Sequence, residues 1–294
     1  MTSTTNPLFF LLSFFLLTLN HACDAPADKN HTSNDITGAI NNTLFNYGTE
    51  SDSARFYYIK GWTEILDNGR WTESEMAYKK AIEFDPNYTL AKSVAGRLIK
   101  NLEEREITLQ EILKDKDKVN TDVKLLLDVY LLSMESLNNM DKRIKGTPEF
   151  TIKRKQTAET NFRKFIHKYP EDDYVKAEYI EWLNYIHGPQ VALDSLHQLA
   201  TERQKQLGFY ISFAASLELE LDNIDSAIAL SKDLKPLMID STYTSYLKLR
   251  AEILMAQDSL NKAKQYIDKV VRIDPNHILA VRLQSEIDNK LKNK

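Results

Sequence analysis

The chain of 294 residues is poor in cysteine, glycine and proline, with one, eight and eight of each. A single cysteine excludes an intramolecular disulfide bond and a cysteine-based zinc site. Few glycines and prolines favour long helices joined by short turns, because these residues interrupt regular structure. Neither sign of charge dominates, since 38 Lys and Arg stand against 42 Asp and Glu, a net charge of −4. This balance predicts no general attraction to nucleic acid, which needs a clustered positive surface.

The chain also lacks the sequence motifs of common active sites. It has no HExxH motif, no GxSxG motif and no glycine-rich phosphate loop. No pair of histidines has metal-ligand spacing beside a carboxylate cluster, so each is interpreted as a surface or interhelix residue. The histidines are His21, His31, His167, His187, His197 and His277. We therefore predict a protein that is not an enzyme and that needs no cofactor and no metal.

What is present begins with an almost entirely apolar run at residues 8–19. As a helix this run is too short to span the hydrocarbon core of a bilayer, because each residue adds only about 1.5 Å. Its length is typical of the apolar core of a secretory signal. We predict a signal peptide over residues 1–22.

Cys23 follows four residues after this run. The placement resembles the lipobox of bacterial lipoproteins, although Asn20 stands where that family usually carries Leu. The resemblance implies a lipid on Cys23 that anchors the chain to the outer membrane of the bacterial cell envelope, facing the periplasm or the cell surface. Plain secretion after ordinary cleavage is the alternative. The next residues are polar, which predicts a flexible, lipid-anchored tether over residues 23–53.

The rest of the chain repeats one helical pattern, first seen in residues 69–86. Three residues on one helix face precede a proline there: Ser74, Tyr78, Ala81 and Pro86. Steps of four and three place side chains on one face, and the proline ends the helix. The small residue that begins the pattern recurs at intervals of 34, 50, 34, 35 and 36 residues, at Ser74, Thr108, Ala158, Ala192, Ala227 and Ala263. Four of these five intervals lie at or near a common period of 34.

This phased series resembles the tetratricopeptide repeat, a helix hairpin with a period of about 34 residues. The resemblance implies an all-α, right-handed superhelical solenoid of about six hairpins over residues 54–291, closed by a capping helix at residues 277–291. Two irregularities are visible. The interval of 50 predicts an insertion at about residues 138–150, either a loop or an N-terminal extension of the second helix. Gly61 lies eight residues before Gly69 instead of the family's seven, so either the turn has an extra residue or Trp62 takes the small position.

Two groups of residues are candidates for partner binding. The first is a basic cluster, which is either a solvated loop or a contact for an acidic partner or anionic lipid surface. Its members are Lys142, Arg143, Lys145, Lys153, Arg154 and Lys155. The second is a row of aromatic residues including Tyr179 and Trp182, which either packs between helices or enriches the concave surface on which this family binds peptides.

The resemblance implies a non-enzymatic scaffold of the cell envelope that binds a peptide or partner protein on its concave surface. Residues 158–179 also resemble repeats of lipoproteins that assemble the outer membrane. The alternative is an accessory or ligand-binding subunit of an envelope enzyme, a transport complex or an outer-membrane assembly complex, with residues 138–155 forming part of a pocket.

Overall fold

The computed structural model describes residues 45–293, and every regular element in that range is a helix. The predicted signal peptide, Cys23 and most of the predicted tether lie outside the described residues. The α-helices are α2 (Asp52–Trp62), α3 (Trp71–Phe84), α4 (Thr89–Leu98), α5 (Leu102–Asp115), α6 (Thr121–Asp141), α7 (Pro148–Lys168), α8 (Asp173–His187), α9 (Pro189–Leu199), α10 (Gly208–Glu220), α11 (Ile224–Leu234), α12 (Ser245–Ala256), α13 (Leu260–Ile273) and α14 (Ile278–Lys292). A π-helix, η1 (Thr63–Asp67), continues α2, and the short 3₁₀ turns are η2 (Lys116–Lys118), η3 (Gln204–Gln206) and η4 (Lys235–Leu237).

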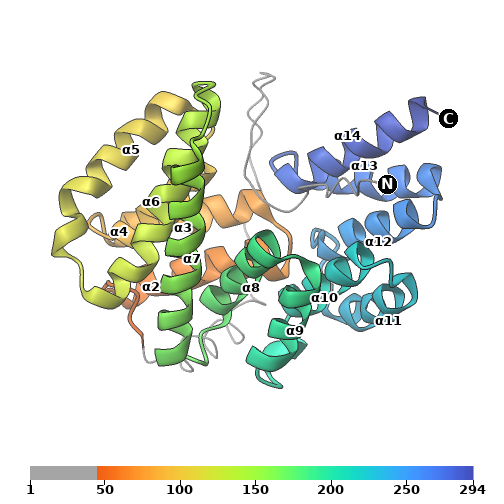
Figure 1. The fold of residues 1–294 in the computed structure, drawn as a ribbon, viewed down its shortest axis with the longest axis horizontal. Helices are drawn as coiled ribbons and strands as arrows, with labels where there is room; N and C mark the ends of the chain where they lie inside the picture. The colour runs from red at the N-terminus through yellow and green to blue at the C-terminus, as the bar shows by residue number, and fades with distance from the viewer. Residues whose placement is uncertain (1–44, 294) are drawn as a thin grey trace.

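Successive helices pack as six hairpins, from α2–α3 to α12–α13, and α14 packs on the last of them. The early hairpins lie on one side of the molecule and α9 to α14 on the other, with α8 between them (Figure 1). This arrangement confirms the predicted all-α solenoid with a capping helix. In three of the repeats, the three residues of the helical pattern are fully buried, with an exposed fraction of 0%. They are Ser74, Tyr78, Ala81, Ala158, Phe162, Phe165, Ala263, Ile267 and Val270.

The long interval before Ala158 is occupied by helix. Both α6 and α7 have 21 residues, and a turn at residues 142–147 joins them. Thr147 accepts a hydrogen bond from the backbone N–H of Phe150, and Pro148 occupies the first turn, so α7 begins with a strong N-terminal signal. The extra residues therefore lengthen a hairpin and carry its turn away from the body of the solenoid.

The extra residue between Gly61 and Gly69 is absorbed by the π-helix η1. Its wider turn closes through the bond from the Asn68 N–H to the Thr63 carbonyl, five residues earlier, at 3.1 Å. Gly61 itself occupies the small position, because a Cβ there would lie 2.5 Å from the Tyr78 ring. The turn is held from inside by Glu64, which is fully buried and accepts from Asn68 at 3.0 Å and from the Arg70 guanidinium at 2.7 Å.

The turn at the end of η1 contacts the N-termini of two later helices, α10 and α12. The Phe209 N–H at the start of α10 donates to the Asp67 carboxylate at 2.8 Å, and the Thr244 N–H before α12 donates to the Asn68 carbonyl at 2.9 Å. The Ser245 hydroxyl donates to the Asp67 carbonyl at 2.7 Å. The turn thereby satisfies backbone donors that helices α10 and α12 leave unpaired.

A second set of contacts also joins the two ends of the solenoid, but here the first hairpin supplies the donors and the last repeat the acceptor. Helix α3 has no side-chain cap of its own at Arg70. Asp274, which follows α13, supplies the cap by accepting from the N–H groups of Trp71 and Thr72 at 2.6 and 3.0 Å and from the Thr72 hydroxyl at 2.7 Å. We refer to these two sets of contacts together as the closure. Through the closure the first hairpin contacts the last repeats, a feature that the periodic pattern does not predict.

Asp67 makes the stability of the closure dependent on pH. Burial raises the pKa of Asp67 to about 7, although bonds from Phe209 and Tyr174 oppose the shift. The folded state therefore holds a proton that the unfolded chain releases near pH 4, so the free energy of unfolding falls as the pH rises through this interval.

We expect wild-type protein to gain stability when the pH falls from about 8 to about 5, and the Asp67→Asn variant to gain less, by on the order of 2 kcal/mol. Urea titrations at the two pH values measure this difference. Equal gains in the two proteins would contradict the assignment of the proton to Asp67.

Candidate functional site

The closure borders a cavity of about 230 Å³ at the centre of the molecule, which is partly open to solvent. Residues from both sides line it: the end of α2, η1, the start of α3, and helices α4, α6, α7, α8, α10, α12 and α14. Much of the wall is apolar, formed by Ile65, Leu66, Leu137, Phe209, Phe213 and Leu249. Mostly apolar walls with a few polar groups are typical of small-molecule sites.

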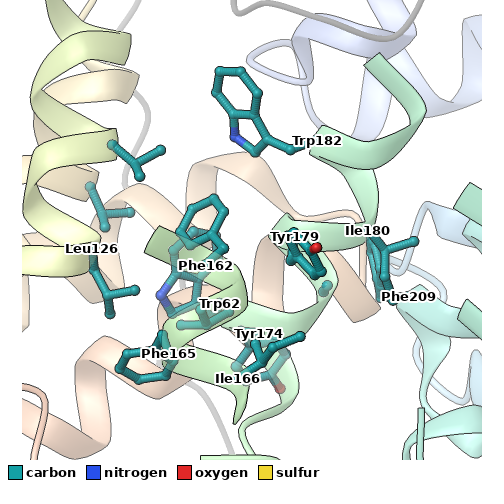
Figure 2. Packing of buried hydrophobic residues seen from close by; sticks show 14 of the residues in the cluster. Trp62, Leu126, Phe162, Phe165, Ile166, Tyr174, Tyr179, Ile180, Trp182 and Phe209 are labelled. Carbon is teal, nitrogen blue, oxygen red and sulfur yellow. The ribbon is translucent and has the colours of Figure 1, made fainter. Parts of the chain in front are cut away.

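All three tryptophans of the chain line this cavity, and each has one face covered. The guanidinium of Arg97 lies 5.4 Å from the Trp62 ring, and that of Arg154 lies 5.6 Å from the Trp182 ring. The His277 imidazole stacks on Trp71, with ring centroids 5.4 Å apart. In Figure 2 the Trp182 indole lies above the other labelled aromatic rings.

Two ion pairs stand in the cavity wall. Arg97 donates to Glu178 at 2.8 Å, and the Tyr130 hydroxyl donates to the other oxygen of the same carboxylate. Lys248 pairs with Glu252 at 2.5 Å along one face of α12. These contacts neutralise two of the cations that line the cavity.

Two further cavity groups are neutral near pH 7. Burial and the nearby Glu178 charge raise the pKa of Glu181 to about 8, although Arg97 and Lys248 oppose the shift. Burial and Lys248 lower the pKa of His277 to about 3, and its Nδ1 accepts a bond from the Ala280 N–H at 3.3 Å. Glu181 in its protonated form can both donate and accept hydrogen bonds.

Arg154 differs from the other cavity cations. The residue is only 6% exposed, and its Nε, like that of Arg97, is buried without a hydrogen-bond partner. Within residues 45–293 no carboxylate forms an ion pair with it. Burial lowers the pKa of Arg154, yet a guanidinium remains charged at neutral pH. The cavity therefore has one buried positive charge without a counterion among the described residues.

The predicted basic cluster does not form one surface. Arg154 points to the cavity with Trp182, whereas Lys155 lies over the Tyr185 ring at 4.5 Å. Lys142 pairs with Glu106, and Arg143 and Lys145 are exposed in the turn after α6. Tyr179 is buried, with 6% of its surface exposed, and packs in the main core. A helix turns by about 100° per residue, so neighbouring basic residues on α7 face different directions.

A second hollow, of about 640 Å³, lies between α5 and α7 above α6. Leu109, Leu113 and Leu131 line it together with Lys142 and Lys153. Leu113 is 43% exposed there, and Glu106, Asp128 and Glu135 line the hollow as well as the lysines. We refer to it as the α5–α7 groove.

Arg154 and Trp182 were already candidates in the sequence, although for partner binding. Other residues of the cavity wall were missed, among them Arg97, Trp71 and His277. Arg154 lies four residues before buried Ala158, on the face that α7 packs inward. Arg97 lies at the end of helix α4, most of whose residues are buried, where a charge needs a partner. Trp71 and His277 leave no such signal, because each reaches the cavity only through the closure.

In the described part of the chain, none of the helices combines the length and apolar character needed to cross a membrane. Over the same residues, no group of three or more His, Cys, Asp or Glu side chains is placed to hold a metal ion.

The hairpins, the closure and the cavity define a protein of the helical-repeat class. Residues 54–88 and 246–277 match the tetratricopeptide repeat family, so the first and last units of the fold are tetratricopeptide repeats. A tetratricopeptide repeat protein from Parabacteroides merdae is similar in structure, with a TM-score of 0.43 and 14% sequence identity over 81% of this chain and 99% of that one. Among curated proteins, no sequence match was found.

Proposed function

We propose that this chain is a non-enzymatic protein-interaction scaffold of the bacterial cell envelope, held at the outer membrane by a lipid on Cys23. The tetratricopeptide repeats carry the proposal, because repeats of this type are suited to extended protein contacts. The apolar run followed by a lone cysteine supports the anchor.

The α5–α7 groove is the surface best suited to a protein partner. The groove is larger than the central cavity, about 640 Å³ against about 230 Å³, and Leu113 is 43% exposed in it. Lys153 is exposed at its edge, and Lys145 lies in the adjoining turn. Within the described residues Lys145 and Lys153 form no ion pair, so each can meet an acidic side chain of a partner, and complementary charge raises the rate of association.

Pull-down from detergent-solubilised envelope tests this proposal. We expect Lys145→Glu with Lys153→Glu to weaken recovery of the partner by roughly tenfold, in a salt-sensitive manner. Lys262→Glu with Lys269→Glu, an equal change of charge at exposed positions of α13, is the control. Cys23→Ser should move the protein out of the membrane fraction. Unchanged recovery would exclude the groove as the contact, and retention of Cys23→Ser in the membrane would exclude the lipid anchor.

The central cavity favours a second candidate function, that of a ligand-binding accessory subunit. Arg154 brings the lengthened α6–α7 hairpin into the cavity wall, opposite residues of the closure. A scaffold that only holds proteins has no need for a cavity lined by a buried charge without an ion pair, because such a charge costs stability. Retention of a small molecule by the purified chain, without any protein partner, would support this candidate.

A further inference from the structure

We propose that the central cavity binds a small organic monocarboxylate, with its carboxylate against Arg154 and its apolar body among the cavity's indole, phenyl and leucine side chains. This inference rests on the ligand-binding candidate and names the chemistry of its ligand.

The need for an anion follows from the surroundings of Arg154. Arg154 is only 6% exposed as a whole residue, its Nε is buried without a hydrogen-bond partner, and it forms no ion pair within residues 45–293. The guanidinium lies over the Trp182 ring, 5.6 Å from the ring centroid. A charge removed from water without a counterion is costly, and a carboxylate matches the planar fork of the guanidinium with paired hydrogen bonds.

The aromatic residues argue against a cationic ligand. Arg97, Arg154 and His277 already cover one face each of Trp62, Trp182 and Trp71. An incoming ammonium group would therefore approach guanidinium groups that occupy the positions a cation prefers. The same contacts leave the indole edges and remaining apolar walls for an uncharged body.

The remaining charges limit the ligand to a single negative charge. Arg97 and Lys248 are already paired, with Glu178 and Glu252, so Arg154 is the cavity cation left to neutralise an anion within the described residues. Both of those carboxylates would repel a phosphate dianion. Glu181 lies on the same helix as Trp182, and its protonated form can donate to a second oxygen of the ligand. The cavity volume of about 230 Å³ suits a molecule the size of an amino acid.

Three probes with related bodies and different charge test this inference on the purified full-length chain in detergent. They are phenylacetate, phenylacetamide and phenethylamine, measured by calorimetry, with hexanoate as a second carboxylate. We expect both carboxylates to bind, and the amide and amine to bind about ten- to hundredfold more weakly, as hydrogen bonds to a charged group require. Equal or tighter binding of the amine or amide would overturn the carboxylate assignment and leave the ligand-binding candidate standing. No binding by any probe would overturn both, and would leave the envelope scaffold untouched.

Arg154→Met supplies the matched variant, with Lys153→Met, exposed on the same helix, as its control. Arg154→Met should weaken phenylacetate binding by about tenfold or more, and Lys153→Met should not. In the absence of probe, Arg154→Met should unfold at a temperature about 2–4 °C higher than wild type, because the uncompensated charge is gone. A lower unfolding temperature together with unchanged phenylacetate affinity would show that Arg154 is structural and would overturn the proposal.

Discussion

Replacing Glu178 with Met is expected to lower the free energy of unfolding by about 3–5 kcal/mol. Glu178 and Arg97 have exposed side-chain fractions of only 6% and 13%, and they meet at 2.8 Å. Burial alone lowers the pKa of Arg97, and the Glu178 charge more than offsets this, so the pKa is raised overall. Without Glu178 the Arg97 guanidinium stays charged between the Trp62 and Tyr130 rings and loses the carboxylate with which it forms its ion pair.

The double variant Arg97→Met with Glu178→Met distinguishes this explanation from a simple packing defect. Removing both charges should restore most of the stability, because an apolar pair of similar volume often replaces a buried ion pair at little cost. Glu75→Met is the exposed control, since the Glu75–Lys79 pair lies on the surface of α3 and should contribute less than about 1 kcal/mol. Guanidinium titrations give all four values. A double variant as unstable as Glu178→Met would show that charge compensation is not the role of Glu178.

The two cavity arginines therefore have opposite expected effects. Arg97 brings its own carboxylate from α8, and loss of that carboxylate destabilises the fold. Arg154 has no such partner among the described residues, and its removal is expected to stabilise the fold. A buried charge that costs stability is a property of functional sites more than of cores. Measurements of the free energy of unfolding can therefore distinguish Arg154 from Arg97 before the ligand is known.

The hairpin packing could be predicted because it depends on contacts close in sequence. The positions of Ala263, Ile267 and Val270 repeat at helical spacing, and all three are fully buried against the neighbouring helix. The turn after each of the two Asp-Pro-Asn segments is also local: Asp85 and Asp274 each accept from the N–H two residues later. Such features depend on rotation per residue and on proline, which the sequence displays directly.

The closure could not be predicted in this way, because it joins residues between 142 and 203 positions apart. Asp274 accepts from its own turn, as Asp85 does, and nothing in the sequence distinguishes the oxygen that also caps α3. The curvature that brings them together accumulates from small rotations at every hairpin contact. The cavity depends on that curvature, so Trp71 and His277 could be placed in it only by the structure, whereas Trp182 was already a candidate.

Gly69→Ala is expected to open the closure. It should also lower the free energy of unfolding by more than backbone strain alone would. Gly69 has a φ of 73°, where a side chain is strained. A Cβ there would also lie 2.6 Å from the Thr244 hydroxyl and 2.8 Å from the Ser245 backbone nitrogen. The second contact is with backbone, so the helix N-terminus of α12 must move away.

Two other glycines separate these causes, and hydrogen exchange reports on the closure directly. Gly188 also has a positive φ, 90°, but has no atom within 4 Å of a Cβ, so Gly188→Ala measures strain alone, about 1–3 kcal/mol. Gly146 has neither a positive φ nor a close neighbour, so Gly146→Ala should be nearly silent. Gly69→Ala should cost roughly 1–3 kcal/mol beyond Gly188→Ala, because of the added clash.

The amides of Trp71, Thr72 and Thr244 donate across the closure, and they should lose protection in Gly69→Ala only. The same variant should bind phenylacetate more weakly, because Trp71 and His277 on one wall separate from Arg154 on the other. Protection and affinity unchanged from wild type would mean that the helix shifts without opening the closure, and that the cavity does not depend on it.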